Sequence, residues 1–123
     1  MFIIDPMSRC PVYEQLIEQI ERYILTGILS PGGQLPSVRA LSVELSVNPN
    51  TIQKAYSELD SRKIIFSVPG KGCFVSENAI TLLGEYNRKQ LGNLEDSLAQ
   101  LKLAGISKDE ITEVLNKVFD ERR

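Results

Sequence analysis

The pair Asn48-Pro49 is the strongest local constraint on the fold, because it marks the residue at which a helix begins. An asparagine side chain accepts hydrogen bonds from the unpaired N–H groups at a helix start, and proline is tolerated at the first helical position. Behind the pair, Ile52, Ala55 and Leu59 recur at helical spacing and predict a buried face. The other positions of the first turns are polar: Asn50, Thr51, Gln53 and Lys54.

Turn-forming residues divide the rest of the first half of the chain into short elements. A helix is predicted over residues 12–26, and Ser37 is a suitable N-cap for a second, shorter helix. Two β-prone segments at 64–68 and 73–75 flank Pro69-Gly70-Lys71-Gly72, in which Pro followed by Gly fits a type II turn. The expected unit therefore holds three helices and a hairpin with a lysine at its tip.

The apolar spacing is helical again from residue 77. Leucines recur at three, four and three residues along a heptad-like seam, and Ser107 with Glu110 forms a capping box that begins a last helix. The sequence predicts a mostly α protein with a small β-hairpin, divided into residues 1–76 and a tail of two helices at 77–123. The residues expected to join two copies are Ile80, Leu83, Leu91, Leu94, Leu98, Leu101, Ile111 and Leu115.

The charged residues are nearly balanced over the whole chain but not within each part. The formal net charge is -2 and the isoelectric point is about 5.2, which is unusual for a protein that binds phosphate groups. Between residues 34 and 75, however, five basic residues stand against three acidic ones. One copy is therefore expected to bind nucleic acid weakly, and two linked copies more tightly.

Several classes of function are excluded by residue types that the chain lacks. It contains no histidine, and its two cysteines, Cys10 and Cys73, lie far apart in sequence. A zinc site, a histidine-dependent catalytic group and a phosphate-binding loop are therefore not expected, and neither an enzymatic activity nor a cofactor is predicted. A signal peptide and a membrane span are also not expected, which favours a cytoplasmic protein.

The polar residues near the predicted helix starts suit contacts with double-stranded DNA. Asparagine and glutamine can bind adenine in the major groove, threonine can contact a thymine methyl group, and helix starts and basic side chains bind phosphate. Asn48 could equally serve only as a cap, and Tyr56 could lie at the edge of the core. The candidate DNA-binding residues are Pro36, Ser37, Arg39, Asn48, Asn50, Thr51, Gln53, Lys54, Tyr56, Gly70, Lys71 and Gly72.

Four linked motifs resemble the DNA-binding part of the GntR family of bacterial transcription regulators. The resemblance implies a winged helix-turn-helix, with Arg39, the start of the helix after Asn48, and the hairpin glycine Gly70 at the operator. Lys63 departs from the family, which usually has glycine at this position, and lysine would cost about 1 kcal/mol if the backbone there is left-handed. The matching segments are Pro11–Leu16, Gly27–Gly32, Leu35–Arg39 and Asn48–Tyr56.

The short tail resembles that of the YtrA subfamily, whose members dimerise through it and are often linked to transporter operons. The expected function is a homodimeric transcription regulator, a repressor, that binds an inverted-repeat operator. The alternative is a winged helix used for contact with another protein, with the leucine seam as the binding surface. The sequence indicates no small-molecule effector.

Overall fold

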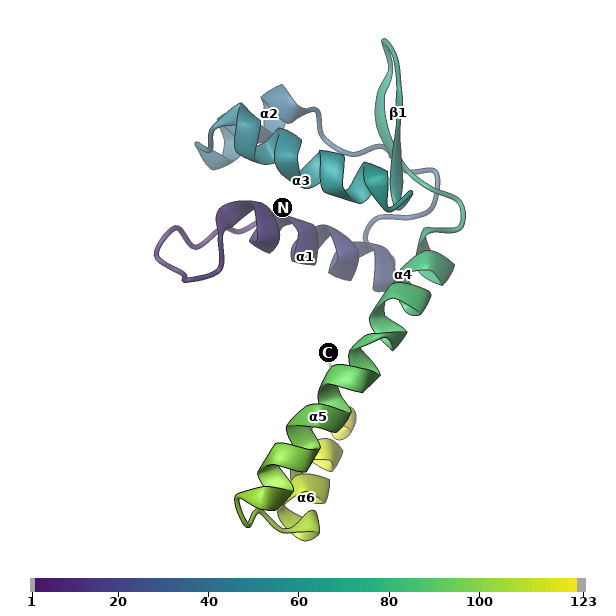
Figure 1. Ribbon diagram of the computed structural model, residues 1–123. Coiled ribbons are helices and arrows are strands. Elements are labelled where there is room, and N and C mark those ends of the chain that lie inside the picture. The colour runs from purple at the N-terminus through teal and green to yellow at the C-terminus, as the bar shows by residue number, and fades with distance from the viewer. Residues whose placement is uncertain (1, 122–123) are drawn as a thin grey trace. The chain divides into compact units, whose positions relative to one another are not determined.

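The computed structural model describes residues 2–121 and confirms a mostly helical chain with one two-stranded antiparallel hairpin (Figure 1). The described residues form two compact units, of which the first ends at Glu85 and the second begins at Tyr86. No helix within residues 2–121 is long and apolar enough to cross a membrane. The elements are α1 (Val12–Leu25), α2 (Val38–Leu45), α3 (Pro49–Ser61), β1 (Ile65–Val68), β2 (Gly72–Val75), α4 (Ala79–Arg88), α5 (Gln90–Leu103) and α6 (Lys108–Asp120).

The core of the first unit lies around α3, which packs against both α1 and α2. The predicted stripe of α1 is buried, and so is the predicted face of α3. Figure 1 shows α1 along one side of α3 and α2 along the other, with the hairpin after the C-terminal end of α3. The buried residues of these helices are Leu16, Ile17, Ile20, Ile24, Leu41, Ile52, Ala55, Tyr56 and Leu59.

The hairpin has the predicted turn and gains a neighbour that the sequence did not predict. The Lys71 N–H donates to the Val68 carbonyl at 2.9 Å, and Gly70 has φ +78°, as a type II turn requires. The segment 32–35 runs beside β2: the Gly32 N–H donates to the Val75 carbonyl at 2.7 Å, and the Leu35 N–H donates to the Cys73 carbonyl at 2.8 Å. Because an isolated hairpin is only marginally stable, this third segment stabilises it.

The junction between α3 and β1 has a left-handed residue at Lys63, where φ is +65°. The Ile64 N–H donates back to the Leu59 carbonyl at 3.0 Å, and the Ser76 hydroxyl donates to the Lys63 carbonyl at 2.7 Å. The backbone at Lys63 is therefore left-handed, so lysine stands in a position that favours glycine.

The start of α4 belongs to the first unit, which corrects two expectations about the tail. Ala79 and Leu83 are fully buried in the same core cluster as α1 and α3. Leu83 is therefore a core residue and not a candidate for joining two copies. The boundary expected after residue 76 moves to Glu85, because the first two turns of α4 complete the core.

The rest of the tail consists of α5 and α6, which the second unit contains. The long helix expected before Gly105 is divided at Lys89, although the φ of -64° and ψ of -22° at that residue remain helical. The predicted capping box is formed, since the Ser107 hydroxyl accepts the Glu110 N–H and the Glu110 side chain bonds back to the Ser107 N–H. No residue of α5 or of α6 is buried, in contrast to every helix of the first unit.

Candidate nucleic-acid interface

The exposed face of α3 begins next to Asn48, the residue that caps the helix. The Asn48 side chain accepts the Asn50 N–H at 2.8 Å, so the capping role of Asn48 is observed, while its side chain remains exposed. Asn50, Gln53 and Ser57 are exposed and follow one another at three and four residues, which places them on one face of the helix. Thr51 is half-buried beside this face. A row of amide and hydroxyl groups therefore lies opposite the buried side of α3.

Gln53 has a defined orientation on this face. Its side-chain amide donates to the Ser57 hydroxyl at 3.1 Å, one helical turn further on. One N–H of the amide is used in this bond, and a second N–H and the amide oxygen are the groups that can meet a base edge. Amide side chains at such positions bind adenine through two hydrogen bonds in the major groove.

The start of α2 offers a second set of polar groups. The Ser37 hydroxyl accepts the Ala40 N–H at 3.0 Å and caps the helix. Ser37 and Arg39 are exposed, and Pro36 is half-buried. A capped helix start followed by an exposed arginine is suited to bind a phosphate group, because the helix dipole and the guanidinium are both positive there.

Lys54 is exposed in α3 but makes a contact within the protein that the sequence did not predict. Its ammonium group lies 3.9 Å from the centroid of the Tyr13 ring in α1, a cation–π contact. The Tyr13 hydroxyl in turn donates to the carboxylate of Glu14 at 3.2 Å. In this conformation Lys54 joins α3 to α1, so the expected contact with phosphate or guanine is not supported.

Tyr56 is likewise used within the protein. Its side chain is only 2% exposed, and its hydroxyl donates to the Pro36 carbonyl at 2.6 Å. Burial raises the pKa of the hydroxyl above its ordinary value, so it stays a donor. Tyr56 is therefore removed from the DNA-contacting residues, and its role is to fix α3 against the residues that lead into α2.

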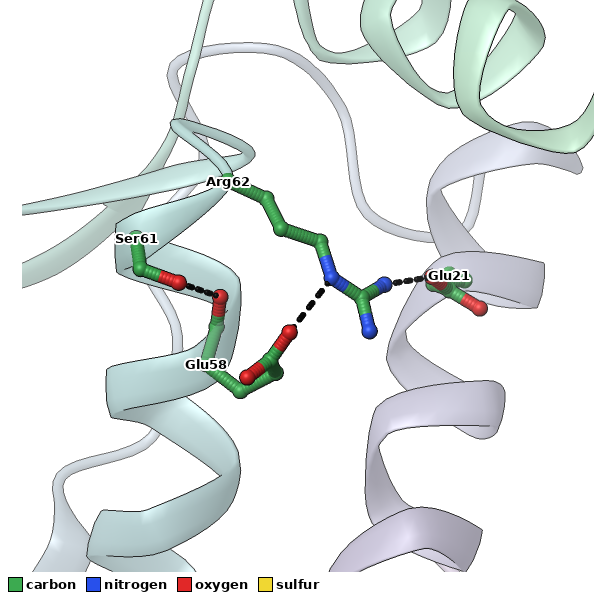
Figure 2. A network of polar contacts seen from close by, with 4 residues as sticks. All are labelled: Glu21, Glu58, Ser61 and Arg62. Atoms are coloured by element: carbon green, nitrogen blue, oxygen red, sulfur yellow. Dashed lines mark hydrogen bonds and ion pairs between the residues drawn. The ribbon is translucent and has the colours of Figure 1, made fainter. Parts of the chain in front are cut away.

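The end of α3 is joined to α1 by a network of charged side chains (Figure 2). The Arg62 guanidinium binds the carboxylates of Glu21 in α1 and Glu58 in α3, each at 2.8 Å. The Ser61 hydroxyl donates to the Glu58 carbonyl at 2.7 Å. Arg62 therefore binds carboxylates of the protein itself, and Lys54 contacts an aromatic ring, which leaves Arg39, Lys63 and Lys71 from the basic residues counted between 34 and 75.

The tip of the hairpin is exposed at Gly70, Lys71 and Gly72, as the sequence analysis expected. The solvent side of the hairpin also carries a cross-strand pair of Phe66 and Phe74, whose rings stack at a centroid distance of 5.8 Å. These rings were not among the predicted contact residues. Their alternation with buried Ile65 and Val75 along the two strands is the signal that could have identified them.

The chain is similar over nearly its whole length to known regulators. The profile of the family described as "Bacterial regulatory proteins, gntR family" matches residues 12–75. The HTH-type transcriptional repressor YtrA of Bacillus subtilis is 39% identical, over 96% of this chain and 92% of YtrA.

Solved structures agree in fold. A GntR family transcriptional regulator from Listeria monocytogenes has a TM-score of 0.74 at 36% identity, over 93% of this chain and 98% of that chain. The DNA-binding domain of AraR, solved in complex with operator ORX1, has a TM-score of 0.54 at 33% identity and covers 60% of this chain and 92% of its own. The relatives are transcription regulators and not enzymes. The chain therefore belongs to the GntR family, and it is a winged helix-turn-helix transcription regulator that binds DNA.

Proposed function

We propose that the protein is a homodimeric repressor that binds an inverted-repeat operator in the cytoplasm. The observation that carries the DNA contact is the exposed row of Asn50, Gln53 and Ser57 behind the capped start of α3. On this proposal Asn50 and Gln53 contact base edges, while Ser37, Arg39 and Lys71 contact the phosphate backbone. The similarity to a named repressor supports repression of the target genes. The resemblance to YtrA-like proteins adds a transporter operon as the proposed target.

The proposal of a dimer is supported by the tail. Leu91, Leu94 and Leu101 are 60%, 51% and 42% exposed in one copy, and no residue of α5 or α6 is buried. Helices of this length are marginal in water without tertiary packing. A second copy that covers the seam supplies this packing and places two DNA-binding units on one operator, as an inverted repeat requires.

The test begins with selection of bound duplexes from a random pool, which yields a consensus and its half-site spacing. Asn50→Ala and Gln53→Ala should each weaken binding to the selected duplex by about 1–3 kcal/mol and leave binding to a scrambled duplex unchanged. Gln100→Ala, which removes an exposed amide from α5, is the matched control. Equal losses on both duplexes would show that Asn50 and Gln53 do not contact bases, and a consensus without an inverted repeat would contradict the dimeric arrangement.

A further inference from the structure

Gln34 lies beside the hairpin although the sequence analysis gave it no role. Its side-chain amide donates to the carbonyl of Lys71 at 2.8 Å, and its backbone bridges to Phe74 in β2. The Lys71 N–H already donates to the Val68 carbonyl. Both backbone groups of the tip lysine are therefore hydrogen-bonded, one within the turn and one to a residue that leads into α2.

Gly72 makes room for this contact. A β-carbon at Gly72 would lie 2.8 Å from the amide nitrogen of Gln34, which is closer than two such atoms can approach. By contrast, a β-carbon at Gly70 would meet no atom within 4 Å, although Gly70 also has a positive φ. The backbone conformation of φ +122° favours glycine at position 72, and a side chain there would also displace the flexible end of Gln34 from its hydrogen bond.

The segment that carries Gln34 links the hairpin to the start of α2. The Leu35 N–H donates to the Cys73 carbonyl, and the Tyr56 hydroxyl of α3 donates to the Pro36 carbonyl. Gln34 therefore lies at the end of a continuous series of contacts from α3, through the residues before α2, to the turn of the hairpin. A hydrogen bond at the tip fixes the turn relative to both helices that carry candidate DNA contacts.

We propose that Gln34 is a positioning residue for DNA binding, which holds the turn of the hairpin so that the Lys71 ammonium meets the phosphate backbone while α3 lies in the major groove. The inference rests on the proposed function, because it requires that Lys71 contacts DNA. Gln34 acts through the Lys71 carbonyl and does not itself need to touch the nucleic acid. The benefit is a lower entropic cost of binding, since the turn is ordered before DNA arrives.

The experiment is a double-mutant cycle between Gln34→Met and Lys71→Ala. Methionine keeps the length and the apolar stem of the side chain and removes the donor, so the fold should be retained, which thermal unfolding checks. Affinity of the full chain is measured between about 50 and 200 mM salt for the duplex selected from a random pool. One phosphate contact accounts for about a 3–4-fold loss of affinity over that interval. Lys71→Ala should remove this loss for each protomer.

The effect of Lys71→Ala should be smaller in the Gln34→Met background, and Gln34→Met alone should flatten the salt dependence. If Lys71→Ala weakens binding equally in both backgrounds, the role of Gln34 is overturned while the DNA contact of Lys71 stands. If Lys71→Ala changes binding in neither background, the hairpin contact and the role of Gln34 both fail. DNA recognition by α3 is then still judged separately from Asn50→Ala and Gln53→Ala.

The two glycines provide an independent comparison. Gly70→Ala and Gly72→Ala both place a side chain on a backbone with positive φ, but only Gly72→Ala displaces the Gln34 amide. Gly72→Ala should therefore reduce DNA affinity more than Gly70→Ala does, and the difference should shrink in the Gln34→Met background. A difference that is unchanged in that background would overturn the proposed contact.

Discussion

Lys54 and Tyr56 show how a side chain suited to DNA can bind a partner within the protein. Both follow the start of α3 within two turns, where sequence analysis expects DNA contacts. The partner of each side chain comes from a distant part of the chain. The Lys54 ammonium lies over the Tyr13 ring of α1, and the Tyr56 hydroxyl donates a hydrogen bond to the Pro36 carbonyl. At this scale the residue type indicates what a side chain can bind, and packing decides which partner it meets.

Local hydrogen bonds were predictable and distant ones were not. Asn48, Ser37 and Ser107 each cap a helix as the sequence predicts, because the bond reaches only two or three residues along the chain. The bond from Gln34 to Lys71 joins residues 37 positions apart. Nothing in the sequence near either residue indicates such a partner, since the pairing depends on how the segment 32–35 lies beside β2.

Glu21 gives a prediction about pH. Burial raises the pKa of its carboxyl above the ordinary value of 4.5 more than the neighbouring Arg62 lowers it. An acid with a raised pKa binds more protons in the folded protein than in the unfolded chain, so the free energy of unfolding falls as pH rises between the two pKa values. Glu21→Gln should remove this fall, as urea unfolding at a series of pH values above 4.5 would measure.

The control for this prediction is Glu95→Gln, which replaces an exposed carboxyl in α5. It should leave the pH dependence of unfolding as it is in the unsubstituted protein. A stability difference between Glu21→Gln and the unsubstituted protein that is constant with pH would contradict the expected titration, and so would one that changes in the opposite direction.

At the scale of elements, the buried faces of the helices were predicted, but the change of packing partner at a junction between helices was not. The stripe of α1 and the buried face of α3 were predicted from spacing alone, because amphipathic periodicity is a local property. Helical apolar spacing is present in both α4 and α5, although the leucine seam weakens in α4, and Leu83 is buried in the first unit while Leu91 and Leu94 are exposed. Spacing identified apolar faces, but it could not indicate that the face changes partner near Glu85.

Lys63, at the junction of α3 and β1, gives a prediction about stability. A lysine with φ +65° is strained because its β-carbon crowds the backbone, whereas glycine is not. Lys63→Gly should raise the free energy of unfolding by about 1 kcal/mol, as urea unfolding would measure. Lys63→Ala keeps the β-carbon and should give no such gain, so equal effects of the two substitutions would contradict the strain.

At the scale of the whole molecule, the two units differ in how they are held together. The first unit has a continuous core that includes the start of α4, and the second has helices without buried residues among those described. The leucine seam was expected to join two copies, but its spacing could not indicate that neither tail helix buries a residue within one copy. The first unit therefore buries its own apolar side chains, and a surface that covers the tail helices belongs to the proposed dimer.

The proposed dimer predicts the effect of a charge on the seam. Leu98→Glu places a carboxylate in the middle of the leucines of α5, where a second copy would bury it at a cost of several kcal/mol. We expect sedimentation to show a monomer, and binding to the selected duplex to fall to the level of a single DNA-binding unit. Leu103→Glu is the matched control, because Leu103 is 89% exposed and lies off the seam. Unchanged mass for Leu98→Glu would contradict the proposed interface.

The lack of buried residues along α5 and α6 also affects how DNA binding depends on the concentration of the protein in the cell, if two copies pair through these helices. If the leucine seam is covered only when two copies meet, paired molecules form in proportion to the square of the concentration of single ones, because association is bimolecular. Operator occupancy at low abundance then rises with that square. A small change in synthesis or degradation of the protein would therefore produce a larger change in the output of the genes that it controls.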